Sequence, residues 1–559
     1  MKEIKGKKTE QIKCMKKFGM QEAVVWVICG LLVTVRCIGF GKIPGGFNQD
    51  GALAAVDALA LAEYGTDHFG TFLPAHLEAW GYGQMSALLS YLMVPFIKIW
   101  GLNPVTARLP LLLASLAGAA AVYGLVKYLK DKKTAAVVLL FLAINPWHFM
   151  QSRWALDCNL FPHMFVIGLY FLVTGMDKTK RICLSMFFFA LCMYAYGVAF
   201  YMVPFFLLAS CILLLRAGKI RFLQAALAAL TYFAVAWPIY ITMFLNFMKW
   251  DTVRLPFVTM QYFKDSVRSA DILFFSETPL KQLAANIKTF FELVFLQKRD
   301  LPWNALDAYG TMYLFSMPFI LLGIVLTFYR VRGKLGRAVK AGWRQTARTD
   351  RDNDNAGMGM KILLVYWLCS IFTGLCINSV NVNRINIIFY SHIIFAGIGI
   401  AFIIEKIRWT LACFLVFYGV GSMMFFTAYF TVWNEEIKQY FQADFLEALD
   451  YAEEFECEYY YITPDTQYEG AFHASQVWTL YGMEIDAAYF QGKTDAFLGA
   501  EIPYAERFCY RNPVDAEIKT DLDIGYILRT EDMGRFSAEQ FSIKQFGRYF
   551  VAFPAQYAR

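Results

Sequence analysis

The chain has 559 residues, of which 58% are hydrophobic and only 17% are charged. A soluble protein carries about a quarter charged residues, so this composition excludes an ordinary soluble enzyme and indicates that lipid covers much of the surface. The net charge is +7, but Lys and Arg gather in the first seventeen residues and in short connections, while Asp and Glu gather after Asn434, which indicates membrane topology and not nucleic-acid binding.

Apolar runs of membrane-spanning character recur along the chain, compared with the ~20 residues that a crossing helix needs. They lie at 22–40, 83–100, 108–129, 134–147, 160–176, 182–197, 199–215, 222–247, 309–329, 360–378, 385–404 and 409–431. The basic connections can all face the cytoplasm, together with the N-terminus, only if the run at 83–100 does not cross. Pro95 and Lys98 interrupt that run, which suits a helix at the membrane interface. The sequence therefore predicts a mainly α, polytopic membrane protein of about eleven spanning helices.

This topology divides the chain into a membrane core at 1–433 and a small C-terminal α/β domain at 434–559, placed outside the cytoplasm. Outer loops are expected at 41–107, 148–159 and 248–308, with juxtamembrane helices in them. After Asn434 the pattern predicts a helix over 435–455 and strands near 459–463, 524–528 and 549–553. Cys457 and Cys509 lie in this region and form either a disulfide or two free thiols. The retained first span favours a prokaryotic plasma membrane.

An acidic residue follows the first span directly, in GKIPGGFNQDGALAAVDALALAEYG from Gly41. Gly45 and Gly46 break the helix, and Asn48 or Asp50 can cap a new helix that runs to about Tyr64. Asp50 is thus expected in the first turn of a helix at the membrane surface. It is either a plain helix cap or a functional carboxylate.

A second acidic site lies in the short outer loop, in NPWHFMQSRWALDCNLFPHMF from Asn145 to Phe165. Arg153 and Asp157 are four residues apart in an aromatic and apolar stretch. Charged groups beside hydrocarbon are costly, so their presence indicates function, although an ion pair that merely ends a helix is the alternative.

The combination resembles the GT-C superfamily of glycosyltransferases. The shared features are an acidic residue on a loop helix after the first span, the text Ala143-Ile144-Asn145-Pro146, the pattern Ser152-Arg153-x-Ala155-x-Asp157, and Arg108-Leu109-Pro110 opening the helix between the two acidic loops. Within the superfamily the chain is most similar to protein O-mannosyltransferases and bacterial aminoarabinose transferases. The resemblance covers roughly residues 22 to 200 well, and the rest only by layout.

The resemblance implies inverting transfer of a hexose or pentose from a polyprenyl-phosphate donor to a glycan, lipid or protein acceptor outside the cytoplasm. Asp50 would be the general base, and Asp157 would orient the acceptor or share a divalent cation, Mg²⁺ or Mn²⁺, with Asp50. Candidates for binding the donor phosphate are Arg153, Arg384, Lys264 and Arg268. Relatives often carry an Arg-Tyr-like pair where this chain has Arg384-Ile385.

Candidates for the acceptor or sugar lie in the first outer loop. They are His76, Glu78, Trp80 and Tyr82. A surface position for the histidine and interfacial anchoring for the aromatic residues are the alternatives. The rival function is a polytopic transporter or lipid flippase without glycosyl transfer, against which the sequence shows neither duplicated halves nor paired broken helices.

Overall fold

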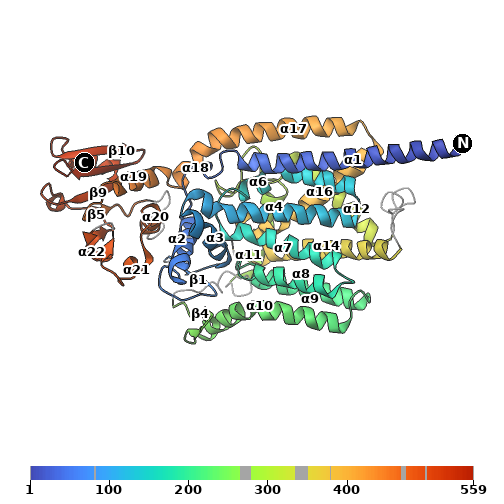
Figure 1. Ribbon diagram of the computed structural model, residues 1–559, viewed down its shortest axis with the longest axis horizontal. Coiled ribbons are helices and arrows are strands. Elements are labelled where there is room, and N and C mark those ends of the chain that lie inside the picture. The colour runs from blue at the N-terminus through green and yellow to red at the C-terminus, as the bar shows by residue number, and fades with distance from the viewer. Residues whose placement is uncertain are drawn as a thin grey trace.

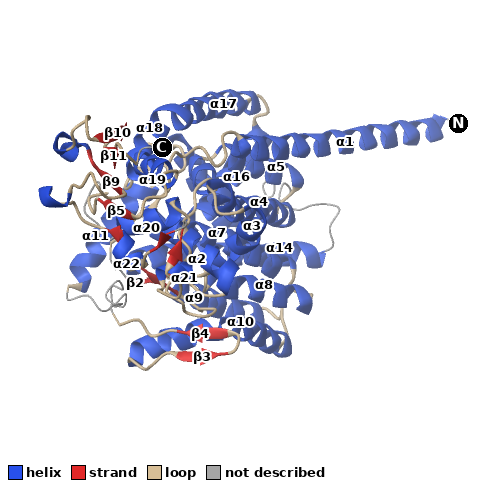
Figure 2. Ribbon diagram, turned by 60° about the vertical axis from the view of Figure 1, so that its left-hand side comes forward, coloured by secondary structure: helices blue, strands red, loops and turns tan. Residues whose placement is uncertain are grey.

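The structure is a computed structural model of the chain and describes residues 2–80, 83–264, 278–333, 350–377, 379–466, 474–497 and 500–557. It is an elongated bundle of roughly parallel helices, with the N-terminus at one end and a β-sheet at the other (Figure 1). Coloured by element type, the larger sheet is confined to the end opposite the N-terminus, and helices make up the bundle itself (Figure 2).

Within the described residues, eight helices are long and apolar enough to cross a membrane. They are α4 (Pro104–Leu129), α7 (Asp157–Thr174), α9 (Ala199–Arg216), α10 (Phe222–Met248), α12 (Met317–Val331, preceded by η3, Leu314–Ser316), α14 (Asp350–Cys376), α16 (Phe389–Lys406, preceded by α15, Val382–Ile385, and η4, Asn386–Ile388) and α17 (Thr410–Ala428). The other runs predicted to cross are helical as well, as α1 (Lys2–Cys37), α5 (Lys132–Ile144) and α8 (Thr179–Cys192). The prediction of a mainly helical, multi-pass membrane protein is confirmed.

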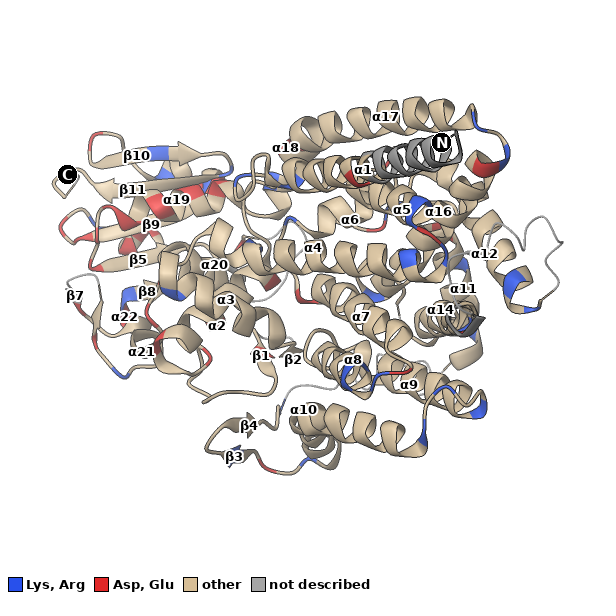
Figure 3. Ribbon diagram, turned by 45° about the vertical axis from the view of Figure 1, so that its right-hand side comes forward, with Lys and Arg blue, Asp and Glu red and all other residues tan. Residues whose placement is uncertain are grey.

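Charge is distributed unevenly along the bundle. Lys and Arg cluster on connections at the end that carries the N-terminus, and many of the Asp and Glu side chains lie on the sheet at the other end (Figure 3). This is the separation that the positive-inside rule associates with one cytoplasmic and one outer end. The side of the membrane on which each terminus lies stays a prediction.

The first predicted outer loop folds against the end of the bundle near the sheet. It contains α2 (Gln49–Tyr64), a short hairpin of β1 (Leu77–Ala79) and β2 (Gly83–Met85), and α3 (Leu88–Trp100). With 13 residues, α3 is shorter than the ~20 residues of a spanning helix, and it packs on α2 and α4. Three further short elements lie in the other predicted outer loops: α6 (Pro146–Gln151), a hairpin of β3 (Val253–Leu255) and β4 (Val258–Met260), and α11 (Pro279–Val294).

The C-terminal region continues directly from α17. A π-helical turn, η5 (Tyr429–Trp433), leads into α18 (Asn434–Tyr440), and α19 (Ala443–Glu453) follows. The single helix predicted over 435–455 is therefore wrong: the chain breaks at Gln442, whose φ of 51° is left-handed and cannot continue an α-helix.

A five-stranded mixed sheet forms the end of the chain, in the order β10-β11-β9-β5-β8. The strand β5 (Tyr459–Ile462) pairs in parallel with β8 (Phe508–Cys509) and β9 (Ile524–Arg529), whereas β11 (Tyr549–Pro554) runs antiparallel to β9 and to β10 (Phe541–Phe546). The strands predicted near 459, 524 and 549 are thus present. The connections contain α20 (Ala474–Gly482), α21 (Ala487–Phe490), α22 (Tyr504–Arg507), a hairpin of β6 (Ala496–Phe497) and β7 (Ala500–Glu501), η6 (Asp515–Glu517) and η7 (Thr530–Arg535). Cys457 and Cys509 are both free thiols.

Candidate active site

Asp50 lies half-buried in the first turn of α2, as the sequence predicts. Asn48 is the N-cap. With its amide oriented to satisfy its neighbours, Asn48 Oδ1 accepts a hydrogen bond from the Gly51 N–H (3.1 Å) and Nδ2 donates to the Ala155 carbonyl (2.9 Å). The cap of α2 therefore also binds the loop that leads to Asp157.

Gly51 brings the two acidic loops into contact. A Cβ atom at this position would lie 2.5 Å from the carbonyl oxygen of Ala155, so only glycine permits this approach of α2 to the loop. Asp157 follows two residues later as the first residue of α7. Both acids thus occupy first turns of helices, where the helix dipole favours a carboxylate. The thiol of Cys158 lies within electrostatic range of both carboxylates.

Two buried arginines hold the linker between α1 and α2. The Arg108 guanidinium donates to the carbonyls of Gly41 (3.0 Å), Pro44 (3.0 Å) and Gly46 (2.6 Å). Arg153 donates to three more carbonyls, those of Arg36, Ile38 (2.7 Å) and Ile43 (3.0 Å). Because its side chain is fully buried among these partners, Arg153 fixes the backbone that carries Asp50. Its contact with the donor phosphate stays a prediction.

A pocket of about 440 Å³ opens beside Asp50. Five segments far apart in the sequence line it together: the start of α2, the loop before α7, the loop after α11, the start of α15, and the C-terminal region. The lining residues are Asn48, Gln49, Asp50, Trp154, Leu156, Asp300, Leu301, Pro302, Trp303, Asn383, Tyr440, Phe441, Gln442 and Trp478. Asp157 is not among them, although Leu156 beside it is.

The C-terminal region packs directly on the Asp50 loop. The Trp478 Nε1–H donates to the Phe47 carbonyl (2.9 Å), and the Phe47 N–H donates to the Phe441 carbonyl (2.7 Å). Gly46, at φ 74°, leaves no room for a Cβ, which would lie 2.3 Å from the Phe441 oxygen. This region therefore forms one wall of the pocket and sets the position of α2.

Arg384, a predicted phosphate ligand, does not itself line the pocket. It follows the lining residue Asn383, is half-buried, and donates to the Ser379 carbonyl (3.3 Å). Lys264 is exposed and does not line the pocket. Arg268 lies outside the described residues.

The predicted acceptor residues lie apart from the pocket. His76 is buried, with ring centroids 6.0 and 6.2 Å from those of Phe200 and Phe263. Glu78 accepts a long hydrogen bond from Gln261 (3.4 Å). Trp80 stacks on His68 at 5.2 Å. None of these three lines the Asp50 pocket, and Tyr82 lies outside the described residues, so their role stays a prediction.

A divalent cation would find few ligands here. Among the described residues there is no group of three His, Cys, Asp or Glu side chains that could hold one metal ion. Two carboxylates are a sparse set for Mg²⁺ or Mn²⁺, which prefer six oxygen ligands and would take the rest from water and substrate. No step of the proposed mechanism uses a metal.

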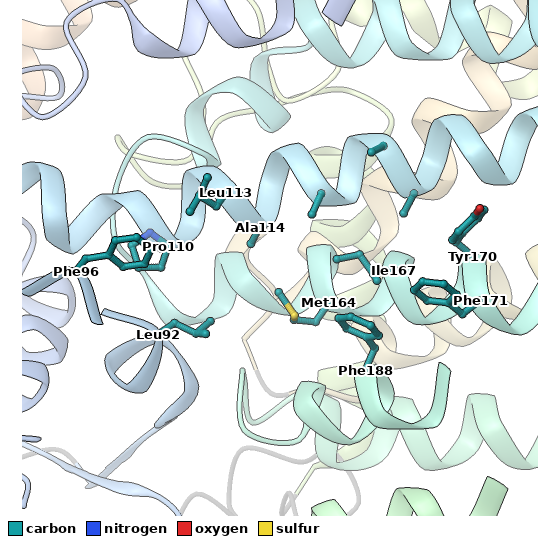
Figure 4. A pocket seen from close by; sticks show the side chains of 13 residues that line it. Leu92, Phe96, Pro110, Leu113, Ala114, Met164, Ile167, Tyr170, Phe171 and Phe188 are labelled. Carbon is teal, nitrogen blue, oxygen red and sulfur yellow. The ribbon is translucent and has the colours of Figure 1, made fainter. Parts of the chain in front are cut away.

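A second cavity, of about 650 Å³, lies between α3, α4, α7 and α8 (Figure 4). Phe96 and Leu113 face it at one end, Phe171 and Phe188 at the other, and Tyr170 supplies the only hydroxyl of its lining. It shares no residue with the Asp50 pocket. A cavity of this composition accommodates hydrocarbon, and its one hydroxyl group is that of Tyr170.

Most lining residues of the Asp50 pocket were not predicted from the sequence, among them Trp154, Asp300, Trp303, Asn383, Tyr440 and Trp478. Asp300-Leu-Pro-Trp303 was the one available signal, since a carboxylate next to proline and tryptophan in a predicted outer loop is unusual in a chain with so few charges. Nothing local marks Tyr440 or Trp478, because only packing brings them to α2.

No family model matches the sequence, and no curated protein matches it significantly. Among solved structures, apo ArnT from Cupriavidus metallidurans is similar along nearly its whole length, with a TM-score of 0.51 and 11% identity over 96% of this chain and 98% of that one. The chain has the GT-C fold.

Other GT-C structures are similar at lower scores. ArnT bound to undecaprenyl phosphate has a TM-score of 0.48 at 11% identity and covers 96% of this chain and 99% of its own. The oligosaccharyltransferase of Archaeoglobus fulgidus, in complex with Zn and sulfate, has a TM-score of 0.48 at 12% identity over 82% of this chain. This chain spans 61% of the length of that enzyme. The similarity to apo ArnT confirms the predicted GT-C resemblance at the level of fold.

Proposed function

We propose that this protein is a membrane-embedded glycosyltransferase that moves a hexose or pentose from a polyprenyl-phosphate donor to an acceptor hydroxyl, with inversion at the anomeric carbon. The observation that carries the proposal is the place of Asp50, half-buried on the wall of a 440 Å³ pocket at the end of the bundle opposite the N-terminus. A carboxylate so placed meets the headgroup of a lipid whose chain stays in the bilayer.

In the proposed reaction the acceptor oxygen attacks the anomeric carbon while the bond from that carbon to the phosphate oxygen breaks. Asp50 takes the proton of the acceptor hydroxyl, which is worth ~10²–10⁴-fold in rate for a well-placed base. The electron pair of the broken bond leaves on the phosphate. Asp157, at the start of α7 across the Gly51–Ala155 contact, orients the acceptor.

Arg384 is the cation that would bind the leaving phosphate. A guanidinium can meet two phosphate oxygens at once, and positive charge near the departing oxygen lowers the barrier to bond cleavage. We assign this role to Arg384 because it follows the pocket-lining Asn383 and is half-buried, whereas Arg153 is fully buried and held by backbone carbonyls. The predicted contact of Lys264 and Arg268 with the donor phosphate stays a prediction.

The test is transfer activity of the purified protein with undecaprenyl-phosphate mannose, glucose and arabinose. We expect wild type to release undecaprenyl phosphate and Asp50→Asn to lose more than ~10²-fold of this activity with its melting temperature unchanged. Asp521→Asn, an exposed carboxylate far along the chain, is the matched control and should be fully active. Full activity of Asp50→Asn would refute the assignment.

The same purified protein also tests the rival transport function and the need for a metal ion. A transporter or flippase would move labelled lipid across a vesicle membrane and release no sugar. A cation shared by Asp50 and Asp157 would make activity sensitive to EDTA and restorable by Mg²⁺ or Mn²⁺. For localisation, we propose a prokaryotic plasma membrane with the C-terminal region outside. An impermeant thiol reagent should then label Asp521→Cys on intact cells beyond the level of wild type.

A further inference from the structure

An aromatic corner lies on the wall of the Asp50 pocket. Trp303 and Tyr440, both half-buried, line the pocket with ring centroids 6.2 Å apart and planes at 71°. One comes from the loop after α11 and the other from α18. Two aromatic faces that meet at nearly a right angle offer flat apolar surface on two sides of whatever occupies the pocket.

This corner is held in place from behind. Arg299 forms an ion pair with Glu436, and the Trp433 indole N–H donates to the Pro302 carbonyl (2.8 Å). Both contacts tie the loop of Trp303 to the helical segment that ends with Tyr440. The corner is therefore preformed and its geometry does not depend on a ligand.

Asp300 also holds the loop that carries Trp303 in place. Its carboxylate accepts hydrogen bonds from the N–H groups of Val382 (2.6 Å) and Leu301 (2.7 Å) and from the Asn304 side chain (3.1 Å). The bond to Val382 anchors the start of α15, where Asn383 lies. Asp300 is thus a positioning residue that holds Asn383 and Trp303 on one wall.

Two buried polar atoms of pocket-lining residues have no hydrogen-bond partner among the described residues. They are the indole Nε1 of Trp154, whose side chain is 1% exposed, and the amide Oδ1 of Asn383. A buried polar atom is costly to leave unpaired. One is a donor and the other an acceptor, and a hydroxyl group can pair with both types.

We propose that these residues form the subsite for the sugar of the lipid-linked donor. Trp303 and Tyr440 pack against the C–H face of the ring, and Trp154 and Asn383 pair with its hydroxyls. Flat apolar walls with a few placed polar groups are the usual means of recognising such a ligand. The assignment rests on the proposed function and adds recognition residues to a site so far defined by Asp50.

The test measures binding of lipid to the full-length protein in nanodiscs by native mass spectrometry. Each variant is titrated with undecaprenyl phosphate and with its mannose, glucose and arabinose conjugates, and the ratio of the two affinities isolates the sugar's contribution. We expect Trp303→Ala and Asn383→Ala to lower this ratio at least ~10-fold and to bind the bare lipid within ~2-fold of wild type.

Two further variants control for folding. Trp303→Phe keeps an aromatic face and should retain the ratio within ~3-fold. Trp409→Ala removes a tryptophan that is 69% exposed on the membrane part and should leave both affinities unchanged. Melting temperatures of all variants exclude unfolding as the cause.

The outcomes separate the two proposals. If wild type prefers a sugar-bearing lipid and Trp303→Ala keeps that preference, the subsite is wrong and the proposed function stands. If wild type binds every sugar-bearing lipid no better than the bare one, the proposed function fails and the subsite with it. A variant that keeps the donor preference and raises only the KM for acceptor would assign the corner to the acceptor and overturn the donor assignment.

Discussion

The two aspartates of the helix α2 lie in contrasting surroundings. Asp50, in its first turn, is half-buried on a pocket wall. Asp57, seven residues later, is completely buried and binds both the side chain and the backbone N–H of His68 (3.2 Å). Trp80 stacks on His68, and Phe490 from the C-terminal region lies against the same ring. Two turns of one helix thus separate a carboxylate that a substrate can reach from one that is sealed under aromatic residues.

Asp57, His68 and Asp67 form a buried cluster in which the pKa values of Asp67 and His68 are shifted. Burial, together with the nearby Asp57 carboxylate, raises the pKa of Asp67 to about 7. Burial opposes the charged form of His68, but Asp57, Asp67 and Glu78 outweigh this and raise its pKa. The C-terminal Gln491 donates to the His68 carbonyl (2.9 Å). A shifted pKa therefore does not by itself mark an active site, since these groups lie where the first predicted outer loop contacts the C-terminal region.

The largest effect should separate Asp50 from Asp57 directly. Asp50→Asn is expected to lower the transfer rate by more than ~10²-fold with no change in unfolding temperature, because the amide removes the base and keeps the size and shape of the carboxylate. Activity and thermal unfolding measured on one preparation test this. If Asp50→Asn also lowered the unfolding temperature, Asp50 would have a structural role like that of Asp57, and the contrast between the two residues would be wrong.

Gly51→Ala should come next. Its Cβ would lie 2.5 Å from the Ala155 oxygen, forcing α2 away from the loop of Asp157, and a displacement of about 1 Å in a catalytic group can cost ~10²-fold in rate. Gly30→Ala, whose new Cβ meets nothing within 4 Å, is the matched control. Normal kcat in Gly51→Ala would show that the contact between the loops is not needed.

Asp57→Asn should lower stability and leave the chemistry of the folded fraction intact. Removing one partner of a buried ion pair costs about 3 kcal/mol, seen as a lower midpoint of thermal unfolding. Glu63→Gln, on the same helix and exposed, should leave the midpoint unchanged. A stable but inactive Asp57→Asn would move the catalytic role toward this cluster.

The smallest effect is a dependence of stability on pH. Since the folded-state pKa values of Asp67 and His68 are raised, the folded protein binds more protons than the unfolded chain between about pH 4 and somewhat above 7. Stability should therefore fall as pH rises from 5 to 8. Asp67→Asn keeps the acceptor for the Thr71 N–H and cannot titrate, so its melting curve should shift less over this range than that of Asp521→Asn.

Much of the fold could be predicted because the thickness of the bilayer sets the length of the apolar run that a crossing helix needs. Every run predicted to cross is helical, and the interfacial helix α3 is as short as its Pro95 and Lys98 suggest. The helix over 435–455 was predicted unbroken, because no proline or glycine marks Gln442, where the chain turns to place α19 on the sheet. Strand β10 was not predicted, although its first four residues, Phe541 to Lys544, alternate between apolar and polar.

The sequence alone predicts that α2 begins at Asn48 or Asp50 and that an apolar run follows Asp157 from residue 160, because glycines, caps and apolar periodicity act over a few residues. The contacts of Arg153 with backbone carbonyls, and the meeting of Trp303, Asn383 and Tyr440 with Asp50 around one pocket, are seen only in the folded structure. These residues are far apart in the chain, and the close packing that unites them leaves no local pattern in the sequence.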